Sequence, residues 1–466
     1  MIKGIGRKVY IGGICGISLS TIANILKANG HMVCGSDEVA GGEIYDSLVN
    51  EGIEVFSNLT DQHIKRFLPD SYIYSVAIKE DNPEYIYAMQ NSIEIIPRGQ
   101  ALGFIAKEYE KVVAIGGTHG KTTSTSLVSH VLLSCGFDPT CHIGGVSKNL
   151  ESNHRIGVNN DIFVTEACEY YDSFLYLRPY ISAVLNIGED HMDYFKSVDN
   201  LKLSFLKFIK NTMVNGFVIV NKDDKNIKTI LNDIPRDKNV ITYSIENGDA
   251  DVCITSCRKL YDGKLVFDCS YFGLNISEIY LPLVGKHNLY NALVSVIVAK
   301  LFGIADQDIR KSIASFEGVE RRYEYIGKIN GASVIHDYAH HPDEINAVIE
   351  EAKSTTSGNV YVVFQPHTYS RTKTLWCEFS DCLKKAYRTI LYPIYPAREQ
   401  PIDGVSSENL CKFINENNGH CYFIPDYATL LLALKKLVKA DDTVLILGAG
   451  DVVGFKKYLL TRQDDL

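Results

Sequence analysis

The segment that most constrains this chain is a glycine-rich run of eight residues, GGTHGKTT, at positions 116–123. The apolar residues 112–115 precede it and a periodic apolar stretch, 122–134, follows it, so it is expected to join a strand to a helix. Glycines let a backbone curl until successive N–H groups point at phosphate oxygens, and a helix N-terminus adds partial positive charge. The pattern therefore predicts a phosphate-binding loop.

In such a loop, Lys121 would neutralise charge on the β- and γ-phosphates, and the hydroxyl of Thr122 would offer a ligand to Mg²⁺. The loop departs from the standard spacing, because the position of the first glycine is taken by Ile115. An unrelated glycine turn is the alternative interpretation. The residues expected to contact the phosphates are Gly117, Thr118, Gly120, Lys121, Thr122 and Thr123.

Strand-like and helix-like segments alternate along the chain in three blocks, which predicts an α/β protein with three consecutive α/β domains. We expect a Rossmann-like N-terminal domain at 1–108, a phosphate-loop central domain at 109–318 and a Rossmann-like C-terminal domain at 319–466. The central domain includes a β-rich extension at 240–283, where Tyr-Asp-Gly-Lys at 261–264 is a hairpin signal, followed by helices near 288–302 and 306–316.

A carboxylate is expected to lie close to the loop. Glu166 follows the predicted strand 162–164, and the carboxyl end of a strand beside a phosphate loop suits a second Mg²⁺ ligand. Further on, Asn186 ends a strand and the segment GEDHMD at 188–193 follows, with His191 among acidic neighbours. This acidic group could bind a second cation; the alternative is that His191 is an ordinary surface or capping histidine.

Composition excludes some classes of protein. The formal net charge is −9, so no excess of Lys and Arg is available for general nucleic-acid binding. The twelve cysteines contain no C-x-x-C pair and indicate reduced thiols in a cytoplasmic protein. A signal peptide is the alternative for the N-terminus, but glycines interrupt its apolar run. The most apolar helical stretch, 289–304, is too short and too polar for membrane insertion.

Eight segments in this order resemble the Mur ligase family. They are GTHGKTT (117–123), EACEY (166–170), 186–193, GKHNLYNA (285–292), GVERR (318–322), DYAHHP (337–342), FQPH (364–367) and GAGD (448–451). Within the family, the segments DYAHHP and FQPH most resemble the member that adds L-alanine. The resemblance implies ATP-dependent ligation of L-alanine to UDP-N-acetylmuramate through an acyl phosphate, in peptidoglycan precursor synthesis, with Mg²⁺ as cofactor.

The resemblance also implies roles for individual residues. Magnesium would be held by Thr122, Glu166 and His191. ATP would further contact His287, Asn291, Arg322 and Asp337. The UDP-sugar would contact Gly13, Gly16, Ser18, Ser36, Asp37 and His119. The amino acid or the transferred phosphate would contact Tyr338, His340, His367 and Arg371, and either His340 or His367 could accept the proton of the attacking amine.

Three positions depart from the family's pattern. The first glycine turn aligns as GICGISLS at 13–20, so Cys15 replaces a glycine, which is tolerable only with a negative φ. Gly116 stands where Ser or Thr is usual. Thr368 follows Phe-Gln-Pro-His where many relatives have an arginine, so Arg371 would act alone on the amino-acid carboxylate.

Other readings stay open from the sequence. A recycling ligase would add a preformed tripeptide to the same sugar nucleotide. A nucleotide-binding partner protein would lack ligase activity, and a dehydrogenase would use the N-terminal turn for nicotinamide binding. The chain could be a monomer or a homodimer.

Overall fold

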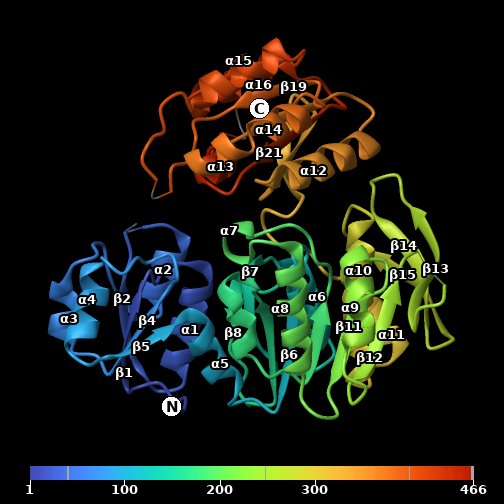
Figure 1. The fold of residues 1–466 in the computed structure, drawn as a ribbon. Coiled ribbons are helices and arrows are strands. Elements are labelled where there is room, and N and C mark those ends of the chain that lie inside the picture. Colours follow the sequence, from blue (N-terminus) through green and yellow to red (C-terminus); the bar gives the residue numbers. More distant parts are fainter. Residues whose placement is uncertain (39–40, 247, 398, 463–466) are drawn as a thin grey trace. The chain divides into compact units, whose positions relative to one another are not determined.

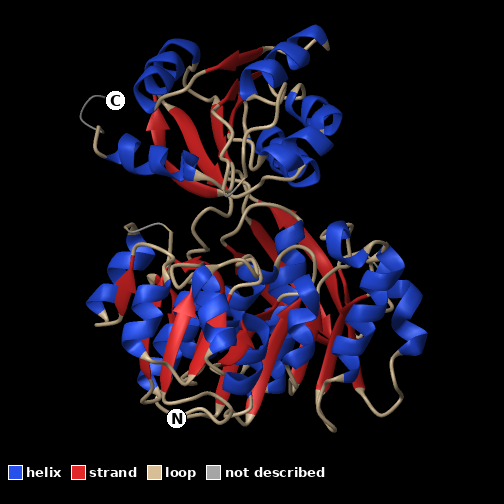
Figure 2. Cartoon of the chain, turned by 60° about the vertical axis from the view of Figure 1, so that its left-hand side comes forward, coloured by secondary structure: helices blue, strands red, loops and turns tan. Residues whose placement is uncertain are grey.

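The computed structural model describes residues 1–466 except 39–40, 247, 398 and 463–466. The fold is α/β, as predicted, with three sheets flanked by helices (Figures 1 and 2). The chain divides into two compact units. The first contains Met1–Arg258 and Leu265–Val319, and the second contains Lys259–Lys264 and Glu320–Leu466.

The first sheet is entirely parallel, in the order β3-β2-β1-β4-β5. Its strands are β1 (Lys8–Gly12), β2 (Met32–Ser36), β3 (Glu54–Phe56), β4 (Ser71–Tyr74) and β5 (Glu94–Pro97). The helices between them are α1 (Ile17–Ala28), α2 (Glu43–Asn50), α3 (Asp61–Phe67), α4 (Pro83–Gln90) and α5 (Arg98–Ala106). The chain order reverses between β1 and β4, and such a switch point opens a crevice at the carboxyl ends of the strands.

The second sheet has ten strands in the order β15-β14-β13-β12-β11-β10-β6-β9-β7-β8. Its strands are β6 (Lys111–Gly116), β7 (Thr140–Ser147), β8 (Ser152–Arg155), β9 (Ile162–Ala167), β10 (Ile181–Val184), β11 (Phe217–Asn221), β12 (Asn239–Ser244), β13 (Val252–Lys259), β14 (Leu265–Tyr271) and β15 (Leu274–Leu281). The predicted turn at 261–264 does join β13 to β14. The strands β7 and β8, which pair antiparallel, had not been predicted.

The helices of this region include three that were predicted, which begin at residues 121, 287 and 306, and three that were not. They are α6 (Lys121–Ser134), α7 (Met192–Phe195), α8 (Val198–Lys210), α9 (Lys225–Ile230), α10 (His287–Leu301) and α11 (Asp306–Ala314), with short 3₁₀ turns η1 (Tyr170–Tyr176) and η2 (Leu231–Asp233). The helix α10 is buried along most of its length because its residues are apolar on nearly every face, and it packs against α6.

The third sheet belongs to the second unit and has the order β16-β17-β21-β18-β19-β20. Its strands are β16 (Glu324–Ile329), β17 (Ala332–Asp337), β18 (Val360–Phe364), β19 (Arg388–Leu391), β20 (Cys421–Phe423) and β21 (Thr443–Leu447). Only β16, an antiparallel edge strand, had not been predicted. The helices are α12 (Pro342–Thr355), α13 (Tyr369–Thr374), α14 (Trp376–Leu383), α15 (Ser407–Glu416), α16 (Tyr427–Leu437) and α17 (Gly454–Leu460), with a 3₁₀ turn η3 (Asp451–Val453).

None of the helices within the described part of the chain is both long enough and apolar enough to cross a membrane.

Candidate active site

The predicted phosphate loop does join a strand, β6, to a helix, α6. Two of its glycines have backbone conformations that other residues rarely adopt: φ is +141° at Gly117 and +86° at Gly120. Gly120 is also crowded, because a Cβ atom there would lie 2.8 Å from Oδ1 of Asn291. The loop therefore requires glycine at both positions for its shape.

Lys121 is the first residue of α6, and its side chain turns back over the loop. Its Nζ donates to the carbonyl oxygens of Gly117 at 2.5 Å and Thr118 at 3.2 Å. It also forms an ion pair with Glu169 at 2.9 Å, and the Glu169 side chain is only 1% exposed. Burial lowers the pKa of Lys121, but the Glu169 carboxylate outweighs burial and the pKa is raised. The ammonium is thus charged and held where phosphates are expected.

The opposite side of the loop is attached to the end of β10. The backbone N–H of His119 donates to Oδ1 of Asn186 at 2.8 Å, and the Asn186 amide donates back to the His119 carbonyl at 3.0 Å. The hydroxyl of Thr118 accepts from the N–H of Gly188 at 2.8 Å. The His119 side chain itself is exposed. These hydrogen bonds hold the loop against Asn186 and Gly188. The sequence had predicted that Asn186 ends a strand.

Thr122 and Glu166 both lie against two glycines of β7. The Glu166 carboxylate accepts from the N–H of Gly144 at 2.6 Å, and a Cβ on Gly144 would collide with that carboxylate. Thr122 is buried, with its methyl group beside Gly145. A hydroxyl and a carboxylate are both oxygen donors of the kind that Mg²⁺ prefers, so this pair suits that ion.

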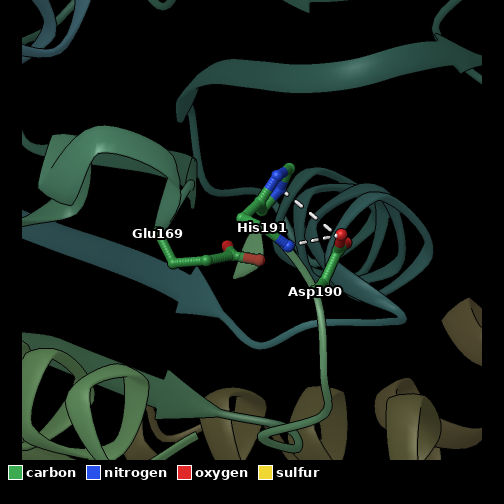
Figure 3. A group of neighbouring side chains, drawn as sticks. All are labelled: Glu169, Asp190 and His191. Carbon is green, nitrogen blue, oxygen red and sulfur yellow. Dashed lines mark hydrogen bonds and ion pairs between the residues drawn. The ribbon is translucent and has the colours of Figure 1, made fainter. Parts of the chain in front are cut away.

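His191 lies in a different group. Its ring, a carboxylate oxygen of Glu169 and one of Asp190 come within 4.8 Å of one another (Figure 3). His191 has a φ of +55°, its N–H donates to Oδ1 of Asp190 at 2.7 Å, and its ring stacks on Tyr170 at 4.2 Å between centroids. Glu169 received no role of its own from the sequence, whereas Asp190 belongs to the acidic group at 188–193 that was expected to bind a cation. Glu169 could have been selected from the sequence because it lies three residues after Glu166 in the segment EACEY.

Asn291 is buried beneath the loop. Its Oδ1 accepts from the Ser124 hydroxyl at 2.8 Å, and its amide donates to Asn288 at 2.8 Å. His287 is the first residue of α10, one turn away. The structure thus brings Asn291 against the start of α6, where its amide is already hydrogen-bonded.

The N-terminal turn connects β1 to α1. The N–H groups of Gly13 and Ile14 donate to the Ser36 carbonyl at 2.8 and 3.1 Å, and the N–H of Cys15 donates to Asp37 at 3.0 Å. Gly13 has a φ of +75°, whereas Cys15 is not among the described residues with positive φ. Cys15 is therefore accommodated without backbone strain. This meets the condition stated from the sequence, that a cysteine is tolerable here only if its φ is negative.

A buried carboxylate lies under this turn. Glu84 is fully buried and accepts from the hydroxyl groups of Tyr10 at 2.8 Å and Ser36 at 2.7 Å. Burial raises its pKa to about 7, against the opposing effect of these two hydrogen bonds. The Ser36 side chain thus points at Glu84, and the part of Ser36 that supports the turn is its carbonyl.

In the second unit, Asp337 ends β17 and is buried. Its two carboxylate oxygens accept from the N–H groups of Tyr323 at 2.7 Å and Ala339 at 2.8 Å, and burial raises its pKa. Beside it, the guanidinium groups of Arg321 and Arg322 lie 4.6 and 5.3 Å from the centre of the Tyr338 ring. Two positive charges therefore flank one aromatic ring next to Asp337.

His340, His367 and Arg371 form a second group in this unit. The two imidazole rings are 6.0 Å apart between centroids, and Nη1 of Arg371 lies 3.4 Å from Nδ1 of His367. Burial, and then the Arg371 charge, lower the pKa of His367 to about 4; burial also lowers the pKa of His340. Both rings are therefore neutral near pH 7, and the lowered pKa makes each a weaker base than an exposed imidazole.

Thr368 is the N-cap of α13. Its φ is +66°, and its hydroxyl accepts the N–H of Arg371 at 3.4 Å. The threonine thus supports the first turn of the helix that carries Arg371.

Comparison with known proteins agrees with these features along the whole chain. Three family models match: the Mur ligase family catalytic domain at residues 8–110, the Mur ligase middle domain at 115–299 and the Mur ligase glutamate ligase domain at 321–450. The chain is 39% identical to the UDP-N-acetylmuramate–L-alanine ligase of Acetivibrio thermocellus, over 96% of this chain and 94% of that protein. It is 38% identical to the enzyme of the same name from Alkaliphilus metalliredigens, over 98% of each chain.

A solved structure shares the fold. The UDP-N-acetylmuramate–alanine ligase of Thermotoga maritima superimposes with a TM-score of 0.82 at 24% identity, covering 98% of this chain and 99% of that chain. Identity to the curated relatives well above 30% over nearly the full length, together with the three family domains in order, shows that this chain belongs to the Mur ligase family.

Proposed function

We propose that the chain is a UDP-N-acetylmuramate–L-alanine ligase, which joins L-alanine to the lactyl carboxylate of its sugar nucleotide and consumes ATP. The observation that carries this proposal is the identity of 38–39% to ligases of that name over at least 96% of the chain. Because the reaction would use ATP and make a precursor of peptidoglycan, we place it in the cytosol. Residues 1–108 would bind the UDP-sugar, 109–318 ATP and 319–466 the amino acid.

The first chemical step would be attack of the lactyl carboxylate on the γ-phosphorus of ATP. Both reactants are anionic, so positive charge must offset their repulsion and stabilise the transition state. Lys121 is charged and stands at the N-terminus of α6. Thr122 and Glu166 would hold Mg²⁺, and His191 would hold a second cation with Glu169 and Asp190. The ion, when bound, neutralises phosphate charge.

Lys121 would have two competing anionic partners, Glu169 and the γ-phosphate of ATP. Before nucleotide binds, the ammonium contacts Glu169 and two loop carbonyls. A γ-phosphate would compete with Glu169 for this ammonium, which would then leave the carboxylate available to a cation. Binding of the negatively charged γ-phosphate to Lys121 would thus free the negatively charged Glu169 to bind the cation.

The second step would be attack of the L-alanine amine on the acyl phosphate. The amine must lose a proton, and the neutral rings of His340 and His367 are available to take it. Arg371, 3.4 Å from His367, would bind the amino-acid carboxylate. Asp337 would contact the ribose of ATP, with Arg322 near its phosphates. Tyr338 would line the amino-acid site together with His340, His367 and Arg371. His287 and Asn291 would face the adenine. In the first unit, the UDP-sugar would contact Gly13, Gly16, Ser18, Ser36, Asp37 and His119.

The test is phosphate release from ATP and Mg²⁺ with UDP-N-acetylmuramate, comparing L-alanine, glycine, L-serine and a tripeptide. Release that is strongest with L-alanine would support the proposal. Release with the tripeptide alone would replace it with a recycling ligase. No release with any acceptor would leave a nucleotide-binding partner protein as the better explanation.

A further inference from the structure

A continuous chain of hydrogen bonds crosses the first unit from the N-terminal turn to the central sheet. Nη1 of Arg98 donates to Oγ of Ser18 at 3.3 Å, and Ser18 lies 2.8 Å from Nε2 of His142. On the other side of the same ring, Nδ1 of His142 lies 2.9 Å from Oγ1 of Thr165. The Thr165 hydroxyl donates to the carbonyl of Glu166 at 3.0 Å. We call these four side chains, Arg98, Ser18, His142 and Thr165, the relay.

The chemistry of the partners determines the direction of every bond in the relay. A guanidinium can only donate, so Ser18 accepts from Arg98. Thr165 has one hydroxyl proton and gives it to a carbonyl, so it must accept from the N–H at Nδ1 of His142. Nε2 is then unprotonated, and it accepts the proton of Ser18. The relay therefore holds one tautomer of a neutral imidazole.

Burial supports the same protonation state. His142 is 3% exposed and lies on β7. Burial, followed by the nearby Arg98 charge, lowers the pKa of His142 to about 3. The ring consequently stays neutral throughout the physiological range, and the direction of the relay does not change with pH there.

Arg98 is held at its backbone as well as at its side chain. It is the first residue of α5, which packs on η1 so closely that a Cβ at Gly99 would lie 2.9 Å from Ser173, and one at Gly103 would lie 2.7 Å from the carbonyl of Tyr176. Within the parts of the chain that the structure describes, no carboxylate forms an ion pair with Arg98. Its charge is therefore fixed in place beside Ser18 without an anionic partner from the protein.

We propose that Arg98 binds an anionic group of the sugar nucleotide and that His142 is the positioning residue that, through Ser18, holds Arg98 for this contact. This inference rests on the proposed function, because the turn at 13–18 is where the UDP-sugar is expected. A guanidinium presents several N–H groups in a plane, so one can bond Ser18 while others remain for phosphate or carboxylate oxygens. The Ser18 proton is already given to His142, which leaves its oxygen to accept from Arg98.

The first experiment measures steady-state kinetics for Arg98→Ala, His142→Leu and His142→Gln. Loss of a charge-assisted contact in Arg98→Ala is expected to raise KM for UDP-N-acetylmuramate by about 10- to 100-fold, with KM for ATP changed by less than about twofold. In His142→Leu the rise is expected to be smaller, about tenfold, because Arg98 keeps its charge and loses only its support. In His142→Gln an amide again offers an acceptor and a donor, so most of the affinity should return.

The matched control is His154→Leu. His154 pairs directly with His142 across β7 and β8 and helps to lower the pKa of His142, but the hydrogen bonds of its Nδ1 are to Ser152 and Asn153. It should keep the KM of the parent enzyme for all three substrates. An equal rise in His154→Leu and His142→Leu would mean a general disturbance of this strand pair and would overturn the positioning role.

Titration with UDP alone separates this inference from the proposed function. Weaker UDP binding in Arg98→Ala and His142→Leu, with normal melting temperatures, supports the relay, whereas unchanged dissociation constants and unchanged KM overturn it. If the parent enzyme turns over no UDP-N-acetylmuramate, the proposed function fails, and the titration still decides on the relay. Nitrogen NMR of His142 gives an independent readout. Nε2 should be unprotonated from pH 6 to 8, and a proton at Nε2 would contradict the relay.

Discussion

At the residue scale, the feature with the largest chemical consequence is the ion pair between Lys121 and Glu169. Lys121→Ala should abolish phosphate release, because no other described side chain in the loop carries a positive charge. It should also destabilise the first unit by about 1–3 kcal/mol, since Glu169 is left buried without its cation. Phosphate-release assays and urea unfolding measure the two effects separately.

The control is the double variant Lys121→Ala with Glu169→Gln. Removing the buried charge should restore most of the stability, while turnover stays absent. Turnover by either variant would mean that the phosphate loop does not take part in the reaction.

Arg371 offers a prediction about the amino acid. Arg371→Ala should raise KM for L-alanine by about 10-fold or more, the cost of a lost charge-assisted contact, and should change KM for ATP far less. The exposed Lys373, on the same helix α13, provides the matched control, since Lys373→Ala removes an equal charge. Steady-state kinetics decides: similar increases of KM for both substrates would remove Arg371 from the amino-acid site.

The residues of the candidate site could be predicted from the sequence only where the local signal is strong. The loop glycines, Lys121 and Thr122 are recognisable because a strand, a turn and a helix follow one another within about twenty residues. Glu169 and Arg98 had no such signal. Glu169 matters because it meets Lys121, 48 positions away, and Arg98 because it meets Ser18, 80 positions away. Contacts of this kind depend on how the chain folds back, which local patterns do not contain.

At the element scale, the phosphate loop tests what glycine contributes to the start of a helix. Gly120 and Gly136 both have a φ of +86°, one before α6 and one after it. Any other residue at either position pays about 1 kcal/mol of backbone strain. Only Gly120 is crowded, since a Cβ there would lie 2.8 Å from Asn291, whereas nothing lies within 4 Å of one at Gly136.

Gly120→Ala should therefore raise KM for ATP by at least about tenfold, because the loop must move away from Asn291 and its N–H groups lose their alignment. Gly136→Ala should lower the melting temperature and leave KM for ATP unchanged. Kinetics and thermal unfolding of the two variants measure this difference, and equal effects on KM would show that strain alone, without the contact to Asn291, disturbs the loop.

Most strands, and the helices α1, α6, α10 and α11, were predictable from apolar periodicity, and the exceptions among the strands have physical causes. The strand β7 contains Gly144 and Gly145, which weaken any strand signal, yet Gly144 is needed there because the Glu166 carboxylate occupies the space of a side chain. The strand β8 reads Ser-Asn-His-Arg and has no apolar alternation. Its place at the edge of the sheet, beside β7, decides its conformation.

At the scale of the whole molecule, the chain consists of two compact units, so its unfolding need not be a single transition. The second unit contains a buried histidine that gives it a pH-dependent stability. His336 is 1% exposed, and neither of its ring nitrogens has a hydrogen-bond partner among the described residues. Burial, then the Arg321 charge, lower its pKa to about 3, with a smaller effect of Lys456 in the same direction and of Glu324 in the opposite one.

The sign follows from linkage. The unfolded chain binds a proton at His336 below pH 6.5, but the folded unit does not until about pH 3, so stability is complete above pH 6.5 and falls as the pH drops. Between pH 7 and pH 5 this residue should account for about 2 kcal/mol of lost stability. His336→Leu should remove that part of the pH dependence, as measured by urea unfolding at both pH values. The same substitution at the exposed His420 should retain it, and identical pH dependence in His336→Leu and the parent would contradict the assignment.

By itself, the sequence determined the α/β class, the order of the three blocks, the phosphate loop and the motifs shared with the family. Each of these is a property of short stretches, in which periodicity and glycine placement act on neighbouring residues. Only the tertiary structure decided that Glu169 meets Lys121, that Cys15 is free of backbone strain, that Gly144 makes room for Glu166 and that His142 joins Ser18 to Thr165. These outcomes depend on distances between segments 20 or more residues apart, and packing of the folded chain alone sets such distances.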